Sequence, residues 1–168
     1  MMLTKGVEQA ICIIVLLATQ ESNAPLASDE ISRRLEVSPS YMKKIMRKLV
    51  VKKLVTSVPG TNGGISLAKD LEDIHMLEVI EAMEGPIAIF PDSGLIRKAF
   101  ENGPHVQKGE SLLRQVFRQA DGLLIDYFSN ITAADLLKES LGTNELPLLD
   151  WNKTSLGDYL NQKSGEKK

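Results

Sequence analysis

The sequence of 168 residues is poor in the side chains that bind metals and that stack on bases. Its one cysteine, Cys12, excludes an internal disulfide and any zinc or iron–sulfur site built by several thiolates of this chain alone. Its two histidines, His75 and His105, are too far apart in the sequence for a metal-ligand motif. Aromatic residues make up 5% of the chain, too few for a platform that stacks single-stranded bases. We therefore expect neither a metal nor a cofactor.

Long hydrophobic runs are also missing. The longest run, Ala10–Ala18, is less than half the length of about twenty residues that a membrane-spanning helix needs. Its length would suit a signal peptide, but Glu8 comes just before it and Lys5 alone supplies positive charge. We interpret the run as a buried first helix, and we expect a cytoplasmic protein without a membrane partner.

The net charge of −2 is small, but its distribution along the chain is uneven. Residues 1–68 carry nine basic and five acidic side chains, whereas residues 69–168 carry eleven basic and seventeen acidic ones. Eight of the basic residues lie within positions 33–53, together with one acid, Glu36. A basic patch on an otherwise acidic protein indicates a chain that meets phosphate with one face only.

Three short helices open the chain. We expect the first to begin after a Thr4 cap and to end before Pro25, and the second to follow a Ser28 cap and end near Leu35. Ser38 then caps a third helix, in which Pro39 takes the first position and which runs to about Lys52. On this third helix Tyr41 or Met42, Ile45 and Leu49 should face inward.

After the third helix the hydrophobic period changes from 3.6 to 2. The pattern predicts strands over Leu54–Val58 and Ile65–Ala68, joined by the turn Pro59–Gly64. A fourth helix over Met76–Glu84 ends at Gly85. The fold class is therefore mainly α with a small β-hairpin, a winged helix-turn-helix.

A long helix over Glu110–Asn130 is the last strong element. Apolar residues recur along it at intervals of four and three, as in the seam of a coiled coil, so we predict a homodimer interface on this helix. A second apolar row of Leu112, Val116, Leu123 and Phe128 widens the seam. The predicted interface residues are Leu113, Val116, Phe117, Ala120, Leu124 and Tyr127.

Four segments follow from these elements: a DNA-binding domain over 1–86, an irregular linker over 87–108, dimerisation helices over 109–141 and a tail over 142–168. The second of the dimerisation helices is short, begins after Thr132 and ends at Gly142. Residues 143–168 have no clear period and end in the polar segment Asn161–Lys168, so we expect most of this tail to be mobile, with Leu146–Trp151 as a candidate docking segment.

The three helices and the hairpin predict how the protein meets duplex DNA. The third helix enters the major groove, where base edges carry an unambiguous code, and glycines at the hairpin tip let the backbone approach phosphate. We expect Lys43 and Ser40 to affect sequence preference and Lys44 and Lys48 to neutralise phosphates. The complete set of predicted DNA-binding residues is Lys5, Ser28, Ser38, Ser40, Tyr41, Lys43, Lys44, Arg47, Lys48, Gly60, Gly63 and Gly64.

Several short motifs in this order resemble the Rrf2 family of winged-helix transcription regulators. They are Leu3-Thr4-Lys5-Gly6, Val37-Ser38-Pro39-Ser40-Tyr41-Met42, Leu54–Ala68 with its glycines, Ile74–Gly85, and Ile131–Leu137. The resemblance covers about residues 2–137. It implies a homodimer whose long helix crosses to the other subunit, bound to a partly palindromic operator, and usually a repressor.

The chain departs from that family where many members hold an iron–sulfur cluster. Those members carry three cysteines between the fourth helix and the dimer helix, whereas residues 90–108 of this chain contain none. A cluster needs thiolates, so we expect a regulator without one. Lys43, Pro59 and Ile65 also stand where relatives often carry glutamate, arginine and an aromatic residue, so the operator sequence is not transferable.

The signal that controls such a regulator leaves alternatives open. Cys12 is either a small core residue, which we favour, or a redox sensor. A small-molecule or protein effector is the other candidate partner. Its pocket would be lined by Ile87, Ile89, Phe90, Leu95, Ile96 and Phe100, although packing on the fourth helix is the favoured use of most of them.

Two classes of function fit the sequence. The first is a sequence-specific DNA-binding transcription regulator, and the second is a winged-helix interaction module that has lost DNA binding. The basic third helix favours the first. The sequence shows no pairing of a nucleophile with a base, so we do not expect an enzyme.

Overall fold

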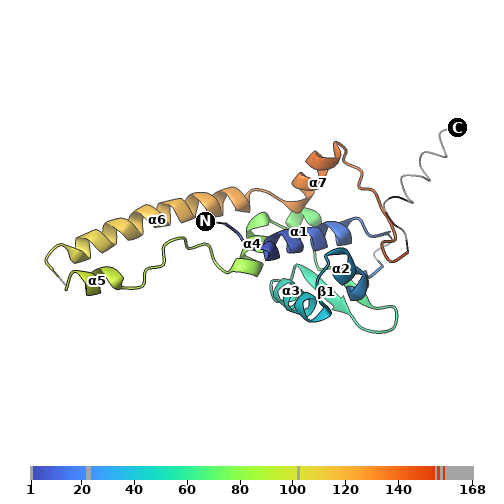
Figure 1. Ribbon diagram of the computed structural model, residues 1–168. Coiled ribbons are helices and arrows are strands. Elements are labelled where there is room, and N and C mark those ends of the chain that lie inside the picture. Colours follow the sequence, from blue (N-terminus) through green and yellow to red (C-terminus); the bar gives the residue numbers. More distant parts are fainter. Residues whose placement is uncertain (1, 22–23, 102, 154, 156, 158–168) are drawn as a thin grey trace.

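The computed structural model describes residues 2–21, 24–101, 103–153, 155 and 157. Figure 1 shows a winged helix-turn-helix domain from which one long helix, α6, extends away, with the short helix α5 beside its far end. The expected fold class is confirmed. No helix in the described part of the chain combines the length and the apolar character needed to cross a membrane.

The first helix, α1 (Lys5–Ala18), lies at the centre of the core. Ala10 and Ile13 are fully buried, because the apolar run supplies core contacts on several sides. The helix ends several residues before Pro25, earlier than expected. Thr4 occupies the capping position without capping, because its backbone and its hydroxyl both donate to Glu84 at the end of α4.

The favoured prediction that Cys12 is a core residue was wrong, because Cys12 is exposed on α1. Partial burial of the thiol, and then the nearby charge of Glu8, raise the pKa of Cys12. Both effects reduce the fraction of reactive thiolate at neutral pH. The structure thus removes the core interpretation without favouring the redox one.

The second and third helices, α2 (Ser28–Arg34) and α3 (Pro39–Val51), form the helix-turn-helix. The Ser28 cap was wrong: Ala27 occupies that position and Ser28 is the first helical residue. The Ser38 cap is confirmed, since the backbone N–H of Tyr41 donates to the Ser38 hydroxyl at 3.2 Å. Pro39 follows as the first residue of α3, where its missing N–H costs nothing.

The hairpin consists of β1 (Val55–Val58) and β2 (Gly64–Leu67), paired antiparallel with Val58 opposite Gly64. The predicted hairpin is confirmed, except that Gly64 belongs to the returning strand rather than to the turn. Leu26 extends this small sheet, because it exchanges two backbone hydrogen bonds of 2.9 Å with Ile65.

Gly64 is needed where the backbone of Leu26 meets the hairpin. A Cβ atom there would lie 2.4 Å from the carbonyl oxygen of Leu26, and backbone cannot yield without breaking the Leu26–Ile65 pair. We therefore expect Gly64→Ala to lower the free energy of unfolding by about 1–3 kcal/mol, measured by thermal or urea unfolding. The control is Gly122→Ala on α6, where a Cβ meets nothing within 4 Å. Equal stability of both variants would contradict this close contact.

A 3-10 turn, η2 (Leu71–Asp73), leads into α4 (Met76–Glu84), whose predicted bounds are confirmed. His75 occupies the capping position, and its backbone N–H donates to the Glu78 carboxylate at 3.1 Å. Gly85 ends α4 with a positive φ of 85°. Because α4 packs on both α1 and α3, it connects the helix-turn-helix to the rest of the chain.

The long helix α6 (Val106–Ser129) begins four residues before the predicted start and is preceded by α5 (Leu95–Ala99). Segment 87–108 is therefore not wholly irregular. It packs along α6 rather than mainly on α4: the rings of Phe90 and Phe117 stack at 4.8 Å, and the Ile89 N–H donates to Asp121 at 2.9 Å. Arg114 on α6 also pairs with Asp92 at 2.7 Å.

The last helix, α7 (Ala133–Leu141), has the predicted Thr132 cap and the predicted Gly142 end. Beyond it the chain returns to the first helices, where Leu149 and Trp151 are buried. The docking prediction for Leu146–Trp151 is confirmed at its C-terminal end. Most of the tail was expected to be mobile, and its polar end, Asn161–Lys168, lies outside the described residues.

Candidate nucleic-acid interface

One face of α3 is buried and the opposite face is exposed. Met42, Ile45 and Leu49 are at most 1% exposed and anchor the helix in the core. Tyr41 was expected as an alternative inward residue, but 41% of it is exposed. The exposed face carries polar and cationic side chains because the helical period separates them from the buried row. The predicted residues Ser40, Tyr41, Lys43, Lys44, Arg47 and Lys48 are all exposed on α3.

Only some of the basic residues of positions 33–53 are available for phosphate. Lys43, Lys44 and Arg47 form no ion pair or hydrogen bond with side chains or backbone in the described ranges. Lys48 instead directs its ammonium at the carbonyl oxygen of Met83, 2.7 Å away, and Lys52 pairs with Glu81 at 3.0 Å. The phosphate contact predicted for Lys48 therefore competes with an anchor between α3 and α4.

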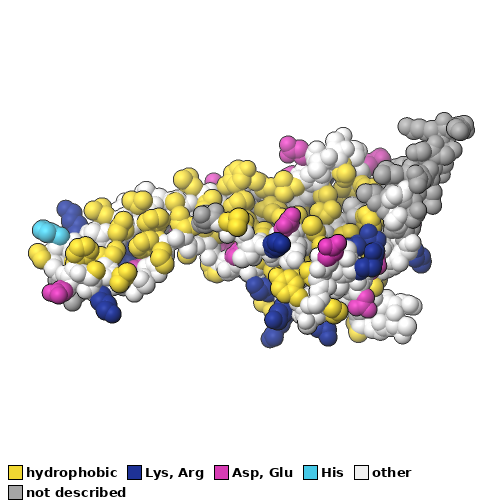
Figure 2. Space-filling model, in the orientation of Figure 1, with side chains coloured by type: hydrophobic (Ala, Val, Ile, Leu, Met, Phe, Trp, Pro, Cys, Tyr) yellow, Lys and Arg dark blue, Asp and Glu magenta, His cyan; other side chains and the backbone are white. Residues whose placement is uncertain are grey.

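Two further basic residues have a structural contact. Both Arg33 and Arg34 pair with Glu30, at 2.6 and 2.8 Å. The Arg33 hydrogen bond is the main reason why the pKa of Glu30 lies below its usual value. The cationic surface is thus narrower than the sequence count suggested, and it is concentrated on α3. Figure 2 shows dark blue side chains gathered at that edge of the domain.

The start of α3 adds hydrogen-bonding groups to this cationic face. Ser38 and Ser40 lie with their hydroxyl oxygens 3.1 Å apart, both exposed. Pro39 has no N–H and the Tyr41 N–H donates to Ser38, so the Ser40 N–H and the helix dipole are what favour an anion at this point. A phosphate group can therefore approach the N-terminal end of α3. The basic side chains of α3 can then reach along the groove of the DNA.

A groove of about 420 Å³ separates α3 from α2 and β1. Ser28, Lys43 and Arg47 line it together, so the structure unites three of the predicted residues. Ser57 lines the same groove and was missed by the sequence analysis. The alternation of side chains along a strand could have identified Ser57, because it places Ser57 on the same face of β1 as the buried Val55.

The remaining predicted residues lie at the edges of this surface. Gly60 is exposed at the hairpin tip with a φ of 108°. The Gly63 N–H donates to the Gly60 carbonyl oxygen at 2.9 Å. Gly64 is half-buried and lies against the Leu26 backbone, and its contact with DNA stays a prediction. Lys5 is exposed at the start of α1, near the Met83–Glu84 end of α4.

A second surface runs along α6 and is apolar. Leu112, Val116, Leu123 and Tyr127 are between 53% and 75% exposed and share one side of the helix. Figure 2 shows the yellow side chains along α6. Of the other predicted interface residues, Leu113 is 39% exposed at the margin of this stripe. Phe117, Ala120 and Leu124 are half-buried, and Phe117 faces its own chain through Phe90.

The six residues proposed to line an effector pocket are not brought together. Ile96 and Phe100 line a groove of about 490 Å³ with Val106 and Leu113, between α5 and α6. Ile87 packs on the main core, and Phe90 stacks on Phe117. Leu95 is 65% exposed. The prediction that these six residues line one pocket is therefore wrong, because only Ile96 and Phe100 line the groove.

The donor atoms in this chain do not fit an iron–sulfur cluster. Such a cluster needs several thiolates, and the single thiol, Cys12, lies on α1 rather than between α4 and α6. Among the described residues, no three His, Cys, Asp or Glu side chains are grouped so that they could hold a metal ion.

Several known proteins are similar to this chain in sequence or in fold. Residues 3–139 match the Rrf2 family, described as an iron-dependent transcriptional regulator. YwgB of Bacillus subtilis (strain 168) is 44% identical over 105 residues, 62% of this chain and 67% of YwgB. YffB of Lactococcus lactis subsp. lactis (strain IL1403) is 34% identical over 150 residues, 89% of this chain and 96% of YffB. Both relatives carry the name of an HTH-type transcriptional regulator.

A solved structure agrees with these relatives in its fold. The global cysteine regulator CymR of B. subtilis superposes with a TM-score of 0.56 at 19% identity, over 81% of this chain and 95% of CymR. The comparisons do not favour the interaction-module alternative. With the cationic α3 and its hairpin, they show that this chain is a DNA-binding transcriptional regulator and belongs to the Rrf2 family.

Proposed function

We propose that the protein is a homodimeric repressor that binds a partly palindromic operator without an iron–sulfur cluster. The observation that carries the DNA contact is the exposed face of α3, where Lys43, Lys44 and Arg47 have no described protein partner. Lys43 and Arg47 line a groove whose other wall includes Ser57 and Ile65 of the hairpin. This surface suits a major groove, which admits one helix, with the hairpin beside the adjacent backbone.

The apolar stripe of α6, defined as Leu112, Val116, Leu123 and Tyr127, supports the dimer. Large exposed apolar residues in a continuous row mark an interaction surface more often than a free one. A two-fold axis through this stripe would present two α3 helices to DNA. Their half-sites would then be separated by about one helical turn, or 34–36 Å, or by a multiple of it. Occupation of such a site within a promoter would block transcription.

The test of this function is selection of genomic DNA by the full-length protein. Purified protein should retain a small set of fragments that share an inverted repeat, and a reporter behind such a fragment should be expressed more strongly when the gene is deleted. Retention of random fragments would contradict sequence specificity. Lower reporter expression in the deletion strain would instead show an activator.

A further inference from the structure

A segment far from α3 in the sequence holds the helix-turn-helix in place. After α7 the chain returns to the helix-turn-helix domain and meets the residues that follow α1. The Leu149 N–H donates to the Thr19 carbonyl at 2.9 Å, and the Glu21 N–H donates to the Leu149 carbonyl at 2.7 Å. We call Leu149–Asn152 the C-terminal strap.

Trp151 anchors the strap by apolar burial and by hydrogen bonds. Only 9% of it is exposed, its backbone N–H donates to the Gln20 side chain, and its indole N–H donates to the Thr19 hydroxyl, both at 2.9 Å. The Arg34 guanidinium lies 4.7 Å above the ring and donates to the Trp151 carbonyl at 3.1 Å. A buried tryptophan with its polar atom satisfied and a cation on its face is held in one position.

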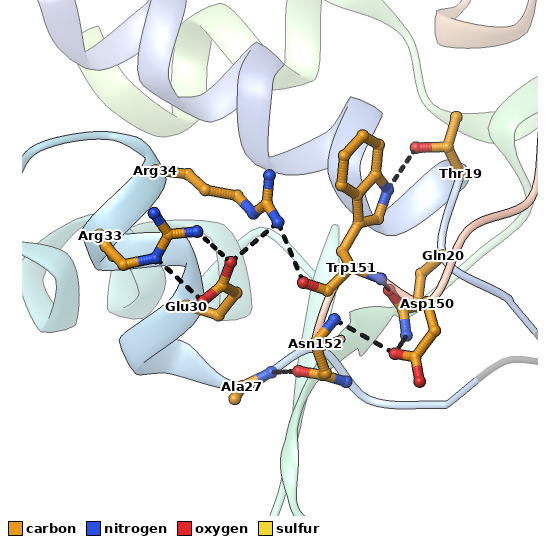
Figure 3. A network of polar contacts seen from close by, with 9 residues as sticks. All are labelled: Thr19, Gln20, Ala27, Glu30, Arg33, Arg34, Asp150, Trp151 and Asn152. Carbon is orange, nitrogen blue, oxygen red and sulfur yellow. Dashed lines mark hydrogen bonds and ion pairs between the residues drawn. The ribbon is translucent and has the colours of Figure 1, made fainter. Parts of the chain in front are cut away.

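Asn152 contacts the opposite end of α2. Its side-chain oxygen accepts from the Ala27 N–H at 3.0 Å, and its side-chain amide donates to the Pro25 carbonyl at 3.1 Å. Ala27 is the capping residue of α2 and has no side-chain oxygen of its own. The strap therefore supplies polar contacts that the local sequence lacks, and Figure 3 shows them on both ends of α2.

These contacts lead directly to the DNA-reading surface. Asn152 fixes the start of α2, and Trp151 holds Arg34 in its last turn. Because α2 packs on α3, and because Leu26 pairs with β2, the strap restrains both walls of the groove. None of its residues lines that groove.

We propose that Trp151, Asn152 and Arg34 are positioning residues for DNA binding, and that the C-terminal strap keeps α3 and the hairpin in their DNA-competent arrangement. This inference rests on the proposed binding of an operator. Removal of the Asn152 side chain leaves the core intact, since Asn152 is exposed, but frees the start of α2.

The experiment compares the full-length protein with Asn152→Ala and Asn152→Asp. Asn152→Ala should bind the selected operator about five- to tenfold more weakly, the effect of losing one or two net hydrogen bonds. The slope of log affinity against log salt should stay unchanged, because no phosphate contact is lost. Asn152→Asp keeps the acceptor for the Ala27 N–H and places an anion at a helix start, so it should restore most of the affinity.

Trp151 is the only tryptophan in the chain, so its fluorescence reports on the strap without DNA. Acrylamide should quench Asn152→Ala more strongly than the wild type, at a temperature where circular dichroism shows both folded. Asn144→Ala, at an exposed position before the strap, is the matched control and should change neither quenching nor affinity.

Each outcome decides the proposal. Wild-type affinity in Asn152→Ala would contradict the positioning role of the strap and leave the operator function intact. A slope of log affinity against log salt reduced by about one, as for a lost phosphate contact, would do the same. A wild-type protein that binds no specific DNA would overturn the proposed function, and the positioning role with it, even if quenching shows that the strap is docked.

Discussion

Replacement of Lys43, Lys44 and Arg47 together by alanine is expected to abolish specific operator binding at physiological salt. These are the α3 cations without a described protein partner, so their loss should leave the fold unchanged. Hydrogen bonds to charged groups each contribute roughly 1.5–3 kcal/mol, which predicts at least about a hundredfold loss of affinity. If all three contact phosphate, the salt slope should fall by about three. Fluorescence anisotropy across a salt series measures both quantities.

The matched control removes positive charge elsewhere. Lys98→Ala lies on α5, at the far end of α6, and its side chain is exposed. It should leave both the affinity and the slope close to the wild-type values. If Lys98→Ala and Lys44→Ala weakened binding equally, the attraction would depend on overall charge, and the α3 surface would not be the interface.

Lys48 lies on the same helix but differs from these three cations, because it has a partner within the protein. The sequence groups it with Lys44 as a phosphate contact, but its ammonium lies on the Met83 carbonyl of α4. A pattern of charges along a helix shows which residues share a face, but not which of them a distant carbonyl or carboxylate occupies. The same limit applies to Arg34, whose contact with Trp151 spans 117 positions.

The winged helix-turn-helix was predictable because its signals are local. Ser38 and Pro39 fix the start of α3, and the change of period from 3.6 to 2 marks β1. The strap was only partly predictable. Trp151 in an apolar segment indicated docking, yet nothing near Asn152 indicates that it would meet Ala27, 125 positions away.

Cys12 and α6 show a further limit of periodicity. A helix that is apolar on nearly all sides does not reveal which side faces solvent, so Cys12 was placed in the core although it is exposed. On α6 the spacing identified an apolar seam without distinguishing packing on its own chain from packing on another copy. The contact between Phe90 and Phe117 resolves this, because it assigns the Phe117 side to the same chain.

Leu123→Glu is expected to convert the protein into a monomer. In the isolated chain Leu123 is 75% exposed, so the glutamate can remain solvated and the fold should be unchanged. In the proposed dimer the carboxylate would be buried without a partner, at a cost of roughly 3 kcal/mol or more, which is a dissociation constant about a hundredfold higher. Sedimentation or light scattering at micromolar concentration would detect the change. Operator affinity should fall with it, because one subunit reaches only one half-site.

Two companion variants identify the face of α6 that is used. Gln115→Glu introduces the same charge on the polar side of the helix and should remain dimeric. Leu124→Glu replaces a half-buried residue beside the chain's own packing face, so it should lower the free energy of unfolding as well. If Leu123→Glu stayed dimeric while Leu124→Glu dissociated without loss of stability, the seam inferred from spacing would be the true interface and the exposed stripe would not.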